Sequence, residues 1–127
     1  MAQEGIQVDV TLSFDVFWGW VNGHPNCVLR AGTPECALYD DEDLHWHFAS
    51  EEPGAMMVQL LRGKRLVGEV YVEPDQVAYV QASLGEQEGE YLFELISETK
   101  TDRFVAYYFV LSHGYEEESP FTPARVH

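Results

Sequence analysis

The chain has 127 residues, of which 46% are hydrophobic, and it carries 22 Asp and Glu against 7 Lys and Arg, a formal net charge of -15. Its length and composition predict one folded domain over residues 1–127, with a short N-terminal lead (1–5) and a mobile C-terminal tail (116–127). The negative charge argues against direct binding to nucleic acid or to a membrane surface, because both are dense arrays of negative charge.

The first expected element is a long β-strand from Val8 to Trp20. Apolar residues occupy every second position of this segment: Val8, Val10, Leu12, Phe14, Val16, Trp18 and Trp20. Mostly polar or small residues lie between them, which predicts one buried and one solvated face. A period of two is typical of a strand, whereas a helix has 3.6 residues per turn.

Two short strands are expected at 26–30 and 35–39, on either side of a turn near Ala31 and Gly32. Such a turn would place Cys27 opposite Cys36, at a separation that a disulfide can bridge. No basic patch followed by an apolar run marks a secretory signal near the N-terminus. We therefore expect a cytoplasmic protein in which two free thiols are favoured over the disulfide.

Alternating apolar residues predict the remaining strands. They are a strand at 44–49, a hairpin formed by 56–61 and 66–72, a strand at 76–84 for which a short helix is the alternative, and a hairpin formed by 91–97 and 103–112. About eight strands at this spacing predict an all-β fold, either an antiparallel β-sandwich or a small β-barrel.

Acidic residues gather at three places in the sequence. They are Asp40, Asp41, Glu42 and Asp43, then Glu86, Glu88 and Glu90, and finally the run 116–118. If the second group is extended, its side chains share one face about 6.7 Å apart, loosely comparable to the phosphate repeat of a nucleic-acid strand. Taken singly, each group is better explained as a solvated loop, and only the total charge supports a function. We expect a non-enzymatic binding protein that engages a basic protein partner, as an inhibitor of a nucleic-acid-binding protein or as an immunity factor.

His45 and His47 indicate an alternative function. Residues two apart on a strand point to the same side, so these imidazoles can share one metal ion. With Glu51 they have the spacing H-x-H-x3-E, which resembles the first metal-binding motif of cupins, small all-β barrels that hold a transition metal. The resemblance implies one divalent transition metal, a small-molecule ligand or substrate, and a further ligand, for which His113 is the candidate. The cupin pattern has a leading Gly where this chain has Tyr39, and the second cupin motif is missing.

Without that metal, the two histidines are solvent-facing side chains and no cofactor is expected. The chain has no phosphate-binding Gly-rich loop, nucleophile elbow or C-x-x-C motif, so enzymatic activity is not expected. Aromatic side chains at strand spacing are more often core than the lining of a ligand pocket. An exposed Trp18 or Trp20 would indicate a homodimer.

Overall fold

The computed structural model describes residues 9–52 and 55–116. In this part of the chain, nine strands form two antiparallel sheets, which confirms the antiparallel all-β prediction. The strands are β1 (Val10–Leu12), β2 (Val28–Thr33), β3 (Cys36–Tyr39), β4 (His45–Glu52), β5 (Ala55–Arg62), β6 (Arg65–Val72), β7 (Tyr79–Leu84), β8 (Tyr91–Glu98) and β9 (Arg103–Leu111). The helices are α1 (Phe14–Asn22) and two short 3-10 helices, η1 (Pro25–Cys27) and η2 (Pro74–Gln76). Among the described residues, no helix has the length and apolar composition needed to cross a membrane.

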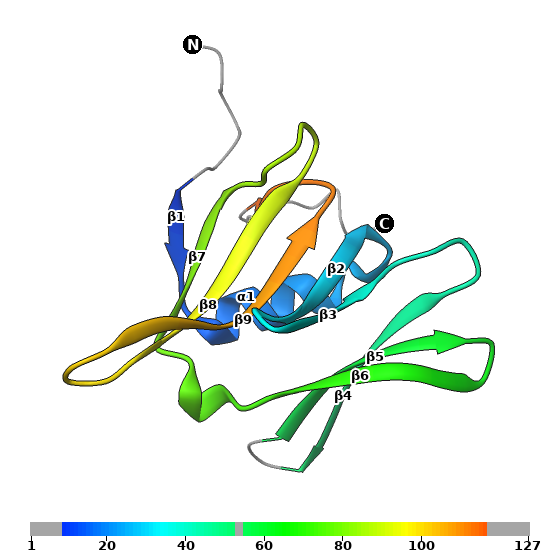
Figure 1. Ribbon diagram of the computed structural model, residues 1–127, viewed down its shortest axis with the longest axis horizontal. Helices are drawn as coiled ribbons and strands as arrows, with labels where there is room; N and C mark the ends of the chain where they lie inside the picture. Colours follow the sequence, from blue (N-terminus) through cyan, green and yellow to red (C-terminus); the bar gives the residue numbers. More distant parts are fainter. Residues whose placement is uncertain (1–8, 53–54, 117–127) are drawn as a thin grey trace, which may run out of the picture.

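The two sheets and the helix enclose one core. The larger sheet has the strand order β1-β7-β8-β9-β2-β3, and the smaller sheet has the order β4-β5-β6. Helix α1 covers one face of the larger sheet (Figure 1), where the Phe17 ring lies 5.3 Å from the rings of both Phe93 and Phe109. From the smaller sheet, Phe48 contacts Phe109 of β9 and Trp18 of α1. The smaller sheet therefore packs beside the helix over the same face.

The predicted strand from Val8 to Trp20 is wrong beyond Leu12, because the chain turns into helix α1. Ser13 has extended backbone angles and accepts a hydrogen bond from the Val16 backbone N–H, which caps the helix. Phe14, Phe17 and Val21 are buried, and their spacing of three and four residues places them on one helical face. Val8 lies outside the described residues.

Trp18 and Trp20 both pack inside the molecule. Trp20 is buried against Phe93, and Trp18 is half-buried between Phe14 and Phe48. The third tryptophan, Trp46, is buried and its indole N–H donates a hydrogen bond to the Val28 carbonyl. The exposed tryptophan that would indicate a homodimer is therefore not found.

The first hairpin has a different turn from the one expected. Ala31 and Gly32 lie within β2, where they pair with Leu38 and Ala37 of β3, and the turn begins after Thr33. Cys36 lies opposite Thr33 instead of Cys27, and both cysteines are free thiols. The prediction that the turn lies near Ala31 and Gly32 is wrong because β2 continues three residues beyond the expected end at residue 30.

The other expected strands are present. The hairpins β5–β6 and β8–β9 form at the expected places, and β4 carries the expected alternation, with Trp46 buried and His45 and His47 exposed. The segment 76–84 is strand β7 from Tyr79, preceded by the 3-10 turn η2.

Candidate functional site

The first acidic group forms the loop between β3 and β4. Asp40, Asp41, Glu42 and Asp43 are all exposed. Backbone hydrogen bonds from Asp40 N to Leu29 O and from Leu44 N to Asp41 O define the path of this loop. The group is therefore a solvated turn, within which the Glu42 backbone N–H donates a hydrogen bond to Asp41 Oδ1 at 2.6 Å.

The second acidic group lies in the tight loop that joins β7 to β8, so its members are not arranged as an extended row. Hydrogen bonds from Gly85 N to Glu90 O and from Glu90 N to Gln87 O close this loop. Gly89 has a φ of 84°, a left-handed conformation that glycine adopts without steric cost. Glu86 and Glu88 are exposed, whereas Glu90 is folded back toward the sheet.

Glu90 is held by Arg30 of β2, on the face of the larger sheet opposite α1. The two guanidinium nitrogens of Arg30 lie 3.4 Å from the two carboxylate oxygens of Glu90. The Arg30 guanidinium also lies 5.9 Å from the centre of the Tyr39 ring. Burial acts to lower the pKa of Arg30, but the hydrogen bond and charge of Glu90 outweigh it and raise this pKa above its usual value.

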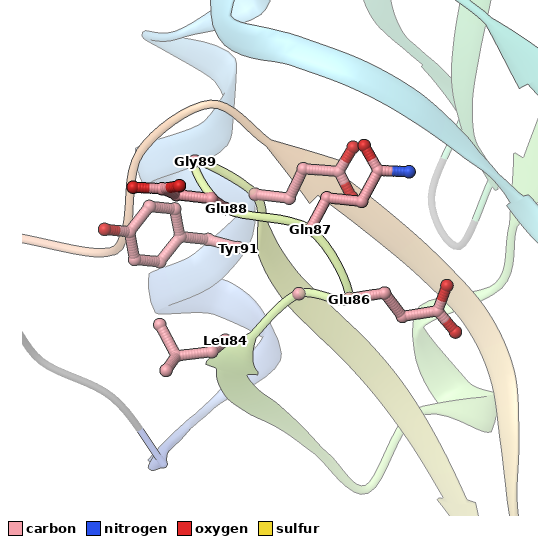
Figure 2. Close-up of a pocket in the computed structure, with 8 residues that line it drawn as sticks. Leu84, Glu86, Gln87, Glu88, Gly89 and Tyr91 are labelled. Carbon is pink, nitrogen blue, oxygen red and sulfur yellow. The ribbon is translucent and has the colours of Figure 1, made fainter.

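Two hollows flank the β7–β8 loop. The first, which we call the loop hollow, has a volume of about 350 Å³ and is lined by residues 84–91. Figure 2 shows Leu84 and Tyr91 on one side of the loop, with the Glu88 carboxylate beside the Tyr91 ring, and Glu86 directed to the other side. The second, the sheet hollow, has a volume of about 340 Å³. Its lining is Arg30, Pro34, Tyr39, Gly85, Glu86, Leu92, Tyr108 and Val110.

Two acidic side chains of the β7–β8 loop, Glu86 and Glu88, form no ion pair with a described side chain, although Arg30, which is paired with Glu90, lines the same hollow as Glu86. The one ion pair among the side chains that the structure describes is Arg30–Glu90. Lys100 and Arg103 lie at the opposite end of β8, roughly 23 Å along the strand. The acidic β3–β4 loop differs in this respect. It leads into the start of β4, where His45 pairs with Leu61 near the end of β5. The loop therefore adjoins the basic turn at 62–65, which joins β5 to β6. The two acidic loops lie apart in Figure 1.

The expected metal ligands are only partly brought together. His45 and His47 lie on the same exposed face of β4, opposite Leu61 and Gln59 of β5. The side chain of Glu51 lies outside the described part, so the H-x-H-x3-E site stays a prediction. No group of three His, Cys, Asp or Glu side chains suited to a metal ion occurs among the side chains that the structure describes.

His113 packs at the end of helix α1, against His24 and Trp20. It does not complete a metal-binding group with His45 and His47 among the described side chains.

The third acidic group is described only at Glu116, which is exposed, and residues 117 and 118 lie outside the described part.

The sequence did not single out the residues that surround the acidic loop. Arg30, Tyr39 and Tyr108 come from three strands and lie near residue 86 only in the folded chain. No local spacing connects them, so no motif was available to find them. In comparisons with known proteins, no family model, curated protein or solved structure matches the chain.

Proposed function

We propose that this protein is a non-enzymatic binding protein that engages a basic protein partner through the β7–β8 loop. The observation that carries the proposal is that Glu86 and Glu88, neither of them in an ion pair with a described side chain, lie on a loop that has a hollow on each side. The net charge of -15 adds long-range attraction for a basic surface. Electrostatic complementarity of this kind speeds association and selects the partner.

The chemistry of the loop hollow suits a lysine or arginine side chain of the partner. Leu84 is 60% exposed and, with the Tyr91 ring, offers apolar surface for the alkyl stem of such a side chain. The Glu88 carboxylate beside that ring is available to the charged head group (Figure 2). Glu86 offers a second carboxylate on the wall of the sheet hollow, where Tyr39 and Tyr108 supply aromatic surface.

The partner class follows from charge. Proteins that bind nucleic acid and many toxic nucleases present basic surfaces to their substrates. A rigid β scaffold that offers carboxylates and apolar anchors to such a surface would block it, as an inhibitor or an immunity factor does. This interpretation agrees with the expectation that the chain avoids nucleic acid itself.

Affinity capture from the native host at low salt, where charge attraction is strongest, tests the proposal. The bound proteins are compared between the wild type and the double variant Glu86→Lys/Glu88→Lys. We expect a specific basic protein to be captured by the wild type, and its affinity to fall by about tenfold or more in the variant.

The matched control is Asp41→Lys/Asp43→Lys, which changes the net charge by the same amount in the other acidic loop. This control should retain most of the affinity. Equal losses in both double variants would show that only the total charge matters, and an unchanged affinity in both would contradict the proposal.

A further inference from the structure

Two histidines that are far apart in the sequence meet at the end of helix α1. His24 follows the helix and His113 follows β9, yet their ring centres lie 5.1 Å apart with an angle of 71° between the planes. Both side chains are half-buried, so solvent can reach them. Trp20 contacts both rings, at 4.8 Å and 5.6 Å between centres.

The hydrogen bonds of the two rings fix which nitrogen carries the hydrogen. His24 Nδ1 lies 2.7 Å from the Trp20 carbonyl oxygen, and His113 Nδ1 lies 3.0 Å from the Gly114 carbonyl oxygen. A carbonyl oxygen only accepts, so Nδ1 is the donor in both rings. In the neutral form, each Nε2 then carries a lone pair. Neither Nε2 has a hydrogen bond within the described part of the chain.

We propose that His24 and His113 together bind one divalent transition-metal ion of the zinc class through their two Nε2 atoms. Two imidazoles on one tetrahedral zinc, with Zn–N bonds of about 2.0–2.1 Å, have ring centres about 5 Å apart. The observed 5.1 Å agrees with this value. A hydrogen bond from Nδ1 to a backbone carbonyl is also the usual support of a metal-bound histidine, because it fixes the tautomer and the ring orientation.

The ligand set indicates both the type of metal and an open site. Imidazole nitrogen favours zinc, nickel and copper over magnesium and calcium, which prefer oxygen ligands. The described side chains provide no third His, Cys, Asp or Glu to this pair, so water or an external ligand fills the remaining positions. The negative net charge raises the local concentration of cations.

Calorimetric titration of untagged protein with Zn²⁺ tests this site. The proteins to compare are the wild type, His24→Gln, His113→Gln and the control His45→Gln/His47→Gln, which removes the exposed histidine pair of β4. We expect one ion per chain in the wild type. Each of the two single variants should weaken zinc binding by at least about tenfold. Removing a residue that only supports a metal ligand already costs about this much affinity. The control should bind as the wild type does.

A second measurement keeps the test valid if a variant folds poorly. Long-range ¹H–¹⁵N NMR spectra of the wild type report the tautomer of each histidine, and Zn²⁺ should shift the Nε2 signals of His24 and His113 together. Absence of zinc binding, binding that survives both single variants, or zinc shifts confined to His45 and His47 would each overturn the proposal. In those cases the two rings make only a packing contact.

Discussion

Arg30 and Glu90 form a two-point contact across 60 residues of sequence, with Nη1 to Oε2 and Nη2 to Oε1 both at 3.4 Å. Arg30 belongs to β2 and Glu90 to the end of the β7–β8 loop. Their side chains are only 22% and 13% exposed. The contact therefore ties the acidic loop to the open face of the larger sheet, beside Tyr39.

This ion pair should contribute a measurable coupling energy to folding. A double-mutant cycle with Arg30→Met and Glu90→Gln, measured by urea unfolding, should give a coupling of about 1 kcal/mol for a charged hydrogen-bonded pair of this burial. Because the pKa of Arg30 is raised, the stabilisation is present below its unfolded pKa and is lost only as pH rises through the folded value. Both values lie far above neutrality, so the coupling should be the same at about pH 7 and pH 9. A coupling near zero would show that the pair does not hold the loop.

The region from Val10 to Asn22 shows why the strands were easier to predict than the helix. The hairpins have local signals, such as a short polar turn between two alternating segments. In the N-terminal segment, alternating apolar residues coexist with helical spacing, since Phe14, Phe17 and Val21 are also apolar. Burial of Phe17 against Phe93 of β8 and Phe109 of β9 favours the helix over the strand. These contacts are distant in sequence, so no local pattern predicts them.

Substitutions at Val16 and Phe17 discriminate between the two conformations. A strand over this segment would bury Val16 and expose Phe17, whereas in the helix Phe17 is fully buried and Val16 is 46% exposed. Phe17→Ala should therefore lower the free energy of unfolding by about 3–5 kcal/mol. Val16→Ala should change it by less than about 0.5 kcal/mol. Chemical unfolding of both variants checks this, and the reverse order would contradict the helix.

Ser13 should be required for the start of the helix. Its hydroxyl accepts a hydrogen bond from the Val16 backbone N–H at 3.2 Å, an N–H that has no other partner at a helix start. Ser13→Ala should lower the free energy of unfolding by about 1 kcal/mol, and Ser13→Asp should preserve it because Asp also caps. Thermal unfolding of the two variants makes the comparison. Equal stability of the Ala and Asp variants would show that the cap has no effect.

For the candidate site, the acidic residues were predictable and their surroundings were not. Glu86 and Glu88 are two residues apart in the sequence, so this acidic cluster can be recognised without the structure. The contact of Arg30 with Glu90, and that of His24 with His113, depends on strand order and register. Long-range pairing of this kind has no local sequence signal.

Alanine substitutions at Gly32 and Gly19 should change the free energy of unfolding in opposite directions. At Gly32, a Cβ atom would clash with the Cys36 carbonyl oxygen and lie 2.6 Å from the Ala37 Cα, both of them backbone atoms of β3. Gly32→Ala should therefore force β3 to move and lower the free energy of unfolding by about 1–3 kcal/mol. At Gly19, in the exposed part of α1, no atom lies within 4 Å of such a Cβ. Gly19→Ala should raise the free energy of unfolding by about 0.5–1 kcal/mol, because glycine is the poorer helix former.

Urea unfolding of the two variants checks both signs in one experiment. The Gly19 variant also tests the helix independently of the core, since alanine helps a helix and has no such benefit in a strand. Destabilisation by Gly19→Ala would contradict the helical assignment. A neutral Gly32→Ala would show that β3 is free to move away from β2, which would in turn leave Tyr39 without a fixed place beside Arg30.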